Sequence, residues 1–397
     1  MFDHLQIQDW RERWLVGCAD AALAPLAAMN GWRRGPAPKA PPRRVLLLRL
    51  ERIGDLLMTL DAIRAVRERA PAAEIRLAVG SWNAELARLL PAVDRVETID
   101  APWLSQEGTR SSPREVAARI LGWRRDELDL AVNFEPDVRS NALLAASGAR
   151  RRIGYDTGGG GGFLTGALRY DRAMHTATNA LRLVDRALPA GGGTLGSAGG
   201  LALGIPEGAE TRAARLLESH DSRRPLVGIN PGAGRAIKEW PAPCFAAAAA
   251  ALAEQDAATI VLLGSASETA TAAAVRDALP PHVRLVDLAG DAPLVDLAAV
   301  LRRLSVLLTA DTGPMHLAAA VGTPVVGIFG PSDPVRYAPL SRRSAVVCAD
   351  LWCRPCGRMR RPPRRCEHGT PDCLSGIHVD AVVDAARRLL HESRRDH

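Results

Sequence analysis

Residues 310–331, ADTGPMHLAAAVGTPVVGIFGP, decide the fold of this chain. Their pattern predicts the end of a strand, a sharp turn, one short helix and a second buried strand. Pro314 is placed where a helix begins, because the first helical turn needs no intrahelical partner for an N–H. The N–H groups near Thr312 and Gly313 are then free to bind an anion, assisted by roughly +0.5 charge from the helix dipole. A polar turn between two apolar strands is typical of the carboxyl edge of an α/β sheet, and it predicts a phosphorylated ligand there.

Strand and helix patterns alternate along the rest of the chain, which predicts parallel sheets. The first strand, Arg43–Leu50, has an apolar run that is continuous rather than alternating, as expected when both faces of a sheet are covered. We expect further strands and helices in the following ranges: strands 74–80, 95–100, 128–134, 226–230, 259–264, 283–287, 305–309 and 324–329; helices 55–70, 82–90, 113–125, 174–188, 245–253, 268–279 and 294–304.

A Gly-rich stretch divides this pattern into two halves of similar size. The sequence therefore predicts an α/β protein of two Rossmann-like domains whose parallel sheets face an interdomain cleft. The glycine run 158–162 is expected to form a flexible loop that faces solvent or substrate. The expected parts are an N-terminal amphipathic and basic extension (1–42), an N-terminal domain (43–190), a linker (191–204), a C-terminal domain (205–378) with a Cys-rich segment (348–373), and a C-terminal helix (379–397).

Composition limits the classes of function. The chain has 397 residues, 47% hydrophobic and 24% charged, which is typical of a soluble globular protein. No apolar run approaches the roughly 18 residues of a membrane span, and no signal peptide is recognisable, so we expect a cytoplasmic protein. The net charge of +7 favours acidic partners such as phosphorylated sugars or anionic lipid. Aromatic content of 4% without a repeated aromatic–basic pattern disfavours a nucleic-acid partner.

The first 42 residues stand apart from the alternating pattern. Residues 2–29 are expected to form an amphipathic helix, and a basic, Pro-rich segment follows at 32–44. One interpretation is a peripheral anchor on the inner face of the cytoplasmic membrane, because Trp beside Arg suits the headgroup boundary. The other is a helix that packs on the body of the protein or on a partner. The candidate apolar positions are Leu5, Trp10, Trp14, Leu15, Leu23 and Leu26.

The loop after the first strand, residues 51–55, carries the first candidate for chemistry. Gly54 is expected to allow a tight turn and Asp55 to begin a helix. Asp55 is then either a helix N-cap, worth about 1 kcal/mol, or a general base aimed at a substrate hydroxyl.

A second loop, NPGAGRAIKEWP (230–241), follows the first strand of the second half. Gly232 and Gly234 would let the backbone approach a diphosphate, and Lys238 would neutralise it with help from Arg235. Lys238 stands out because this chain has only one other lysine, at position 39. The loop is not a Walker A motif, and a solvated surface lysine is the alternative interpretation.

The turn at Asp311 forms a third loop together with His316, although a lone histidine is more often structural than catalytic. Glu268, at the start of a predicted helix, either accepts hydrogen bonds from ribose hydroxyls or only favours the helix N-terminus.

Together these loops resemble glycosyltransferase family 9, the ADP-heptose:lipopolysaccharide heptosyltransferases. The likeness runs from about Arg43 to Leu390 and rests on three segments in order. These are RLERIGD at 49–55, NPGAG at 230–234 followed by KEWP at 238–241, and DTGPMH at 311–316 followed by GTP at 322–324 and FGP at 329–331. The resemblance implies a GT-B fold and an inverting transfer of heptose that needs no metal or other cofactor. It also implies ADP-heptose as the donor and a glycolipid or glycan acceptor such as the lipopolysaccharide core.

The resemblance also implies roles for individual residues. Asp55 matches the catalytic base, with Arg52 and Gly54 on the acceptor side. The implied donor-binding residues are Lys238, Thr312 and Gly313 at the diphosphate, Asp311 at the sugar, Glu268 at the ribose, and Gly232, Gly234 and His316 beside them. Asp61 departs from the family, which usually has proline there, and this puts the acceptor side in doubt. Residues 1–42 have no counterpart in the common family pattern.

Five of the seven cysteines occur late in the chain. Cys353, Cys356, Cys366 and Cys373 have a chelate-like spacing that, in a cytosolic protein, favours a structural Zn or Fe over disulfides. His368 is an alternative ligand, and reduced thiols in an Arg-rich loop are the alternative to a metal.

Two other functions stay open from the sequence. One is a GT-B transferase that uses another nucleotide sugar or a protein acceptor, because no residue identifies the base. The other is a non-catalytic GT-B scaffold that binds a glycan, although a scaffold needs neither Asp55 nor Lys238.

Overall fold

The computed structural model describes residues 2, 5–7, 9–29, 40–101, 103, 111–189, 203–218, 220–221, 223–356 and 365–395. The chain divides into two compact units, Met1–Gly196 and Ser197–His397. Most of the expected linker, 191–204, lies outside the described residues. Within the described part, no helix is both long and apolar enough to span a membrane.

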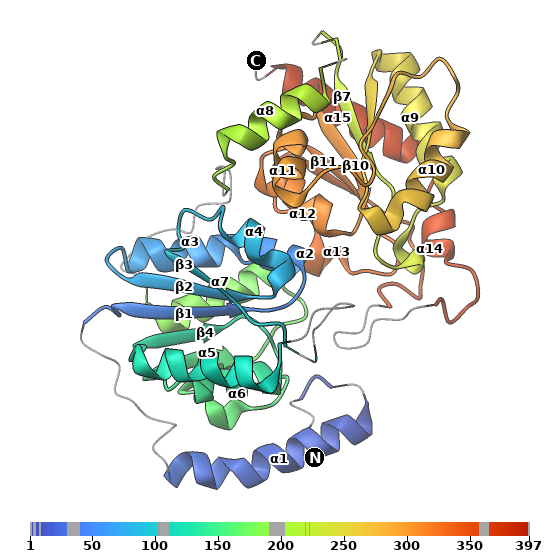
Figure 1. Cartoon of the computed structure of the whole chain (residues 1–397). Helices are drawn as coiled ribbons and strands as arrows, with labels where there is room; N and C mark the ends of the chain where they lie inside the picture. The colour runs from blue at the N-terminus through green and yellow to red at the C-terminus, as the bar shows by residue number, and fades with distance from the viewer. Residues whose placement is uncertain are drawn as a thin grey trace. The chain divides into compact units, whose positions relative to one another are not determined.

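The first unit is built on a six-stranded parallel sheet with the order β3-β2-β1-β4-β5-β6 (Figure 1). β1 lies at the centre, where it pairs with β2 from Arg44 opposite Glu74 and with β4 from Val45 opposite Leu130. The strands are β1 (Arg44–Arg49), β2 (Glu74–Val79), β3 (Arg95–Thr98), β4 (Leu130–Asn133), β5 (Arg151–Tyr155) and β6 (Gly166–Leu168).

Helices connect these strands. α5 begins and ends where the sequence predicts, because Ser112 accepts a hydrogen bond from the Glu115 N–H, Glu115 bonds back to the Ser112 N–H, and Pro113 opens the helix. The helices are α1 (Trp10–Met29), α2 (Ile53–Leu57), α3 (Leu60–Arg69), α4 (Ala84–Ala87), α5 (Pro113–Arg125), α6 (Val138–Ala146) and α7 (Thr176–Ala187), with short 3-10 turns η1 (Ser81–Asn83) and η2 (Gly161–Phe163).

The second unit repeats this plan with the strand order β12-β11-β10-β7-β8-β9, again fully parallel (Figure 1). Its strands are β7 (Leu226–Asn230), β8 (Thr259–Leu262), β9 (Leu285–Asp287), β10 (Val306–Ala310), β11 (Val325–Ile328) and β12 (Ser344–Val347). Its helices are α8 (Glu207–Leu216), α9 (Ala242–Asp256), α10 (Thr269–Ala278), α11 (Leu294–Arg303), α12 (Gly313–Ala320), α13 (Pro334–Tyr337), α14 (Asp372–Ser375) and α15 (Val379–Arg395), with 3-10 turns η3 (Ala236–Lys238) and η4 (Ala266–Glu268).

Each unit has its own apolar core. In the second unit, Trp240 packs edge-on against Phe245 with ring centroids 5.0 Å apart, and α15 contacts α9 and the strands β10 to β12. In the first unit, Trp123 of α5 is buried against the sheet. These cores hold the strand ends, where the candidate site residues lie, in fixed positions.

Several predicted elements differ from the structure. The predicted helix 55–70 is broken at Met58 and Thr59 into α2 and α3, and α2 begins two residues earlier than expected. Gly54 therefore lies inside a helix, and the expected tight turn is wrong. The predicted helix 82–90 is reduced to η1 and the single turn α4. The sequence analysis did not predict β5, β6, β12, α6 or α8.

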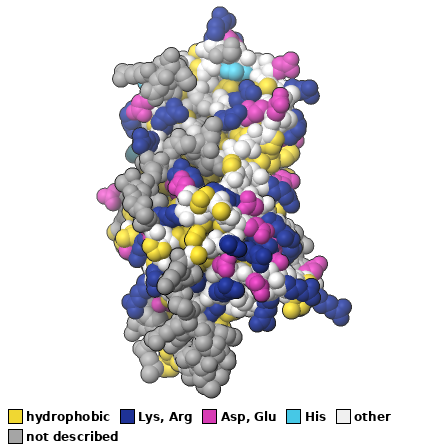
Figure 2. Space-filling model, turned by 90° about the vertical axis from the view of Figure 1, so that its left-hand side faces the viewer, with side chains coloured by type: hydrophobic (Ala, Val, Ile, Leu, Met, Phe, Trp, Pro, Cys, Tyr) yellow, Lys and Arg dark blue, Asp and Glu magenta, His cyan; other side chains and the backbone are white. Residues whose placement is uncertain are grey.

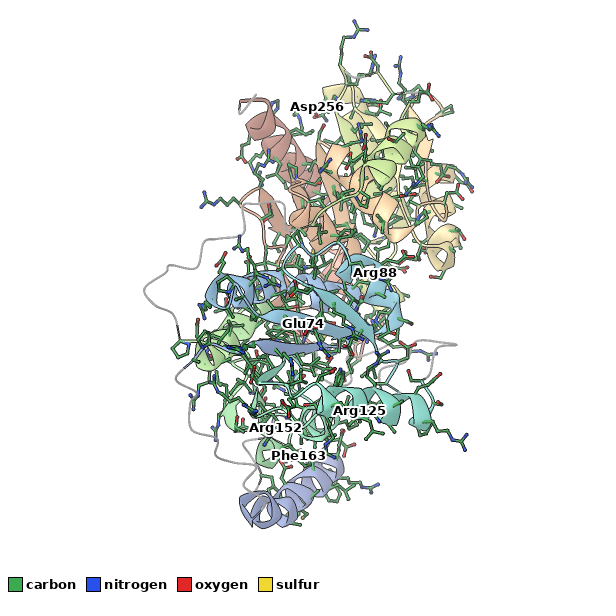
Figure 3. The ribbon with its side chains drawn as sticks, turned by 60° about the vertical axis from the view of Figure 1, so that its left-hand side comes forward. Glu74, Arg88, Arg125, Arg152, Phe163 and Asp256 are labelled. Carbon is green, nitrogen blue, oxygen red and sulfur yellow. The ribbon has the colours of Figure 1, made fainter. Side chains whose placement is uncertain are left out.

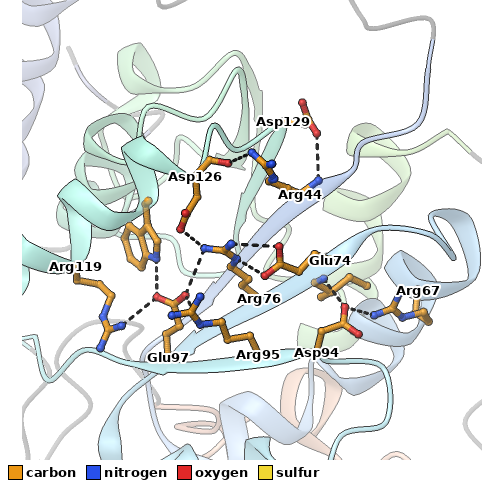
Figure 4. Close-up of polar contacts among 12 residues, drawn as sticks. Arg44, Arg67, Glu74, Arg76, Asp94, Arg95, Glu97, Arg119, Asp126 and Asp129 are labelled. Atoms are coloured by element: carbon orange, nitrogen blue, oxygen red, sulfur yellow. Dashed lines mark hydrogen bonds and ion pairs between the residues drawn. The ribbon is translucent and has the colours of Figure 1, made fainter.

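Buried charged side chains link β2, β3 and α5 in the first unit (Figure 4). Glu97 of β3 is only 4% exposed and accepts a hydrogen bond of 2.7 Å from the Trp123 indole N–H. Arg76, Arg95 and Arg119 lie 3.5–3.8 Å from its carboxylate oxygens. On the surface drawn in Figure 2, basic and acidic side chains are mixed, so the net positive charge is not gathered into one patch on that face.

We expect Glu97→Ala to lower the free energy of unfolding of the first unit by about 2–3 kcal/mol, because it leaves the buried Trp123 N–H without a partner. Urea denaturation checks this value. Glu74→Ala removes a more exposed partner of Arg76 and is the control, with an expected loss below about 1 kcal/mol. Equal losses in the two variants would contradict the structural role given to Glu97.

Candidate active site

The first unit has its topological switch point between β1 and β4. From β1 the chain continues to β2 and β3 on one side of the sheet, and from β4 it continues to β5 and β6 on the other side. Ligands of open α/β sheets bind at the carboxyl ends of such strands. Arg49, the last residue of β1, is 2% exposed and binds both sides of this point. Its guanidinium donates to the Phe134 carbonyl at 2.6 Å and to the Asp55 carbonyl at 3.1 Å. Arg49 therefore ties the end of β4 to the first turn of α2.

The same guanidinium holds two carboxylates. Arg49 lies 2.9 Å from a Glu51 oxygen and 3.3 Å from Asp55 Oδ1. Asp55 is the third residue of α2, not its N-cap, and its Oδ2 accepts a hydrogen bond of 3.3 Å from the Arg52 N–H. Its side chain is 29% exposed, so the carboxylate is both fixed and accessible. Arg52 itself is exposed beside it.

A third carboxyl, that of Glu135, lies close to this pair. Glu135 follows β4, is 1% exposed, and accepts hydrogen bonds from the Leu50 N–H and the Ser140 hydroxyl. Burial raises the pKa of Glu135 and that of Glu51, and the Asp55 and Glu135 carboxylates raise the Glu51 pKa further against the opposing effect of Arg49. A raised pKa at a carboxyl beside a sheet edge is a common feature of functional sites.

The glycine run after β5 closes one side of this edge, and here the prediction of a loop facing solvent or substrate is wrong for Gly158–Gly160. These residues are buried. A Cβ at Gly158 would lie 1.8 Å from the Pro136 carbonyl oxygen, and Gly159 and Gly160 have positive φ angles. Asn141 of α6 donates to the Gly159 carbonyl at 2.9 Å and accepts from Asn133 at the end of β4. The glycines are therefore needed for close packing next to the candidate site.

The second unit has its switch point between β7 and β10. The loop after β7 supplies Lys238 and the turn after β10 supplies Asp311, and the two meet at this point. Lys238 Nζ lies 2.6 Å from Asp311 Oδ2 and 3.4 Å from the Asp311 carbonyl oxygen. Asp311 is buried, whereas the Lys238 side chain keeps 25% of its surface exposed. The interpretation of Lys238 as a purely solvated lysine is therefore wrong.

The environment of Asp311 favours its charged form. Burial alone would raise the pKa of this carboxyl, but Lys238, His316 and a hydrogen bond from Ser332 outweigh burial and lower it. His316 is 6% exposed and lies on α12, the helix that follows Asp311. Asp311 thus remains a carboxylate that orients the ammonium group of Lys238.

The amino terminus of α12 lies next to this ion pair. Thr312 is the N-cap residue, Gly313 is the first helical residue and Pro314 the second, as the sequence predicts. The Thr312 side chain makes no capping hydrogen bond; its hydroxyl donates to the Ala310 carbonyl at 3.3 Å. The first N–H groups of the helix therefore have no intrahelical partner and are suited to bind an anion.

Glu268 reaches the glycine-rich loop from η4. Its carboxylate accepts hydrogen bonds from the Gly234 N–H at 3.3 Å and the Ser265 N–H at 2.9 Å. A Cβ at Gly232 would lie 2.4 Å from the Glu268 carboxyl carbon, so a larger residue there would displace the Glu268 side chain, and Gly234 has a φ of +57°. The structure brings Gly232, Gly234 and Glu268 together on one side of the switch point, with Lys238 and Asp311 beside β10.

The late cysteines are all free thiols. Burial raises the pKa of Cys356 and, to about 11, that of Cys373, and the charges of other thiols in the segment add to both rises. In the described parts of the chain, which omit 357–364, no three His, Cys, Asp or Glu side chains are arranged to hold a metal ion. The predicted ligand set of Cys353, Cys356, Cys366 and Cys373 is therefore not assembled among these residues.

A family model described as glycosyltransferase family 9 (heptosyltransferase) matches residues 120–365, more than half of the chain. The chain belongs to glycosyltransferase family 9. This family 9 glycosyltransferase is 27% identical to lipopolysaccharide heptosyltransferase 2 of Escherichia coli, over 88% of its own length and 97% of that protein. A local match to lipooligosaccharide heptosyltransferase 2 of Haemophilus influenzae reaches 36% identity over 128 residues, which is 31% of this chain and 36% of that protein.

Solved structures show that this glycosyltransferase has the GT-B fold of its relatives. E. coli ADP-heptose lps heptosyltransferase II superposes with a TM-score of 0.70 and 22% identity, covering 88% of this chain and 99% of that chain. A family 9 glycosyltransferase from Veillonella parvula superposes with a TM-score of 0.76 at 22% identity, over 88% of this chain and 98% of that one.

Four residues at the site were not expected from the sequence. They are Arg49, Glu51 and Glu135 in the enzyme's first unit and Ser332 in its second unit. Only Arg49 gave a usable signal, because a charged residue at the end of a continuously apolar strand must find partners when it is buried. The contacts of Glu135 and Ser332 join segments distant in the sequence, and no local pattern predicts them.

Proposed function

We propose that this enzyme transfers a heptose from ADP-heptose to a lipopolysaccharide core or a related glycan acceptor, with inversion at the anomeric carbon. The observation that carries the proposal is the Lys238–Asp311 ion pair beside the amino terminus of α12. It places one positive side chain and free N–H groups where a diphosphate leaving group is stabilised. The names of the relatives, among them a solved E. coli heptosyltransferase "with ADP", support the choice of donor.

In the proposed reaction, Asp55 is the general base. It accepts the proton of the acceptor hydroxyl as that oxygen attacks the anomeric carbon and the bond to the ADP oxygen breaks. Arg49 fixes one carboxylate oxygen and the Arg52 N–H fixes the other, which leaves lone pairs of the accessible carboxylate for the acceptor. Arg52 and Gly54 form the acceptor side of this loop.

The second unit binds the donor in this proposal. Lys238 and the N–H groups at Thr312 and Gly313 stabilise the charge that grows on ADP, and no cofactor takes part in the step. Asp311 keeps Lys238 charged and oriented and contacts the sugar, with His316 beside it. The loop at Gly232 and Gly234 approaches the diphosphate, and Glu268 accepts hydrogen bonds from the ribose.

Two finer points belong to the same proposal. The four late thiols are not arranged to hold a metal within the described residues, and no metal takes part in the proposed transfer; a superposed chain is titled an iron-containing glycosyltransferase, with a TM-score of 0.52 and 15% identity. A lipid-linked acceptor places the enzyme at the inner face of the cytoplasmic membrane.

Thermal unfolding with ADP, UDP, GDP or CDP, each with and without EDTA, tests the function. A ligand at about 100 times its Kd adds roughly 2.7 kcal/mol to stability. Of the four nucleotides, we expect only ADP to raise the melting temperature, and we expect this rise to persist in EDTA. A lower melting temperature in EDTA without nucleotide would indicate a metal held by the thiols. Stabilisation by another nucleotide would exclude ADP-heptose, and no stabilisation by any would favour the non-catalytic scaffold.

A further inference from the structure

The amino-terminal helix exposes an apolar stripe. Within the described residues, eight large apolar side chains are exposed, and three of them lie on α1 within six residues: Trp10 (61%), Trp14 (47%) and Leu15 (73%). Cys18, Ala19 and Ala22 continue the same side of the helix and are also exposed. Because positions 10, 14, 18 and 22 are four residues apart, these side chains form one continuous face. We call the six residues the α1 stripe.

The opposite side of α1 is fixed to the first unit. The Gly160 N–H donates to the Asp20 carboxylate at 2.8 and 2.9 Å, and a Cβ at Gly159 would lie 2.3 Å from Val16. Figure 3 shows Phe163 of η2 next to α1. The preceding segment is also held, because the Gln6 N–H donates to the Thr157 carbonyl at 2.8 Å. The α1 stripe is therefore the outward side of a docked helix.

The chemistry of the stripe fits a phospholipid surface. Trp places an apolar ring and a polar N–H at the boundary between headgroups and acyl chains, and the Arg11 guanidinium lies 5.5 Å from the Trp10 ring centre. Residues 30–44, which follow the helix, contain five basic residues and no acidic residue, which complements anionic phosphates. A second copy of the chain is a poorer occupant, because stable protein interfaces use about 20–30 residues on each side.

We propose that the α1 stripe docks the first unit on the surface of an anionic phospholipid bilayer. The apolar side chains enter the headgroup boundary, and the helix lies along the surface without crossing it. Asp20 and Val16 then hold the Gly158–Gly160 segment, which packs beside the switch point that carries Asp55. Docking thus brings the candidate acceptor edge towards a lipid-linked acceptor; this last step rests on the proposed function, whereas the docking does not.

Co-sedimentation of the full chain with vesicles tests the docking. The vesicles are phosphatidylcholine alone and phosphatidylcholine mixed with phosphatidylglycerol. We expect binding to the mixed vesicles that weakens as salt is raised, since salt screens the basic segment. The double variant Trp10→Gln/Leu15→Gln is expected to lower the partition coefficient roughly tenfold or more, because two exposed apolar side chains no longer insert.

Matched controls separate docking from general loss of apolar surface. Leu121→Gln and Trp352→Gln replace side chains that are 53% and 86% exposed elsewhere, and both are expected to bind vesicles as the wild type does. Unchanged melting temperatures confirm that all variants fold. The proposal is overturned if the wild type ignores anionic vesicles or if the double variant binds equally well. It is also overturned if light scattering without lipid shows a wild-type dimer that the double variant loses.

Discussion

Asp55→Asn is expected to lower kcat for sugar transfer by about 10²–10⁴-fold, the contribution of a well-placed general base. The amide has nearly the same shape, and its single oxygen can accept from Arg49 or from the Arg52 N–H but not from both, so we expect the fold and donor binding to persist with a small loss of stability. The measurement is the transfer rate at saturating donor, together with the melting temperature. Asp185→Asn, which changes an exposed partner of Arg69 on α7, is the control and should transfer at the wild-type rate.

Glu51, the carboxyl next to Asp55, allows a second test of Asp55 as the general base. Burial raises the pKa of Glu51, and a raised pKa also suits a general base, so Glu51 is the competing residue beside Arg49. Asp55 is favoured because Arg49 and the Arg52 N–H both bind its charged form. We therefore expect Glu51→Gln to cost much less activity than Asp55→Asn. The reverse order would move the base to Glu51 while leaving the donor site and the family unchanged.

The fold was largely predictable because short local stretches of sequence are enough to predict the central strands. β1, β7 and β10 each contain a continuous run of apolar residues, and a run of this kind predicts a strand covered on both faces. β5 begins with Arg151 and Arg152 and β6 has only three residues, so neither gives a period-2 or apolar signal. The pairing of β5 with β4 and of β6 with β5 decides these strands, and such pairing is a tertiary property that local sequence does not show.

The candidate site was predictable to a different extent in the two units. Lys238 and Asp311 stand in recognisable loops at strand ends, although their 2.6 Å contact joins residues 73 positions apart. Arg49 shows the limit in the first unit: the sequence marks it as unusual, but not as the residue that binds Asp55, Glu51 and Phe134 together. The glycine run 158–162 misled the prediction, because glycine serves close packing as well as flexibility.

Lys238→Met is expected to remove stabilisation by ADP and also to destabilise the second unit. The substitution leaves Asp311 buried without its strongest positive partner, and breaking a buried pair from one side costs roughly 3–5 kcal/mol. Because Lys238 is partly exposed, we expect a smaller loss, of about 2–3 kcal/mol. Urea denaturation with and without ADP measures both effects.

The pH dependence of stability tests whether the loss of stability in Lys238→Met comes from breaking the Lys238–Asp311 ion pair. In the folded protein the pKa of Asp311 is lowered, so its stabilising contribution is present above the pKa of the unfolded chain, about 3.9, and is lost as pH falls through the folded pKa. Without Lys238, burial raises that pKa, so the charged Asp311 costs stability above the unfolded pKa, and the difference in stability between the wild type and Lys238→Met should shrink as pH falls. Lys238→Met/Asp311→Asn, which has no buried charge, should regain stability at neutral pH but not ADP binding. If the double variant regains ADP binding, Lys238 acts only through the fold; if the difference in stability between the wild type and Lys238→Met does not shrink in acid, the pair does not hold Asp311 in its charged form.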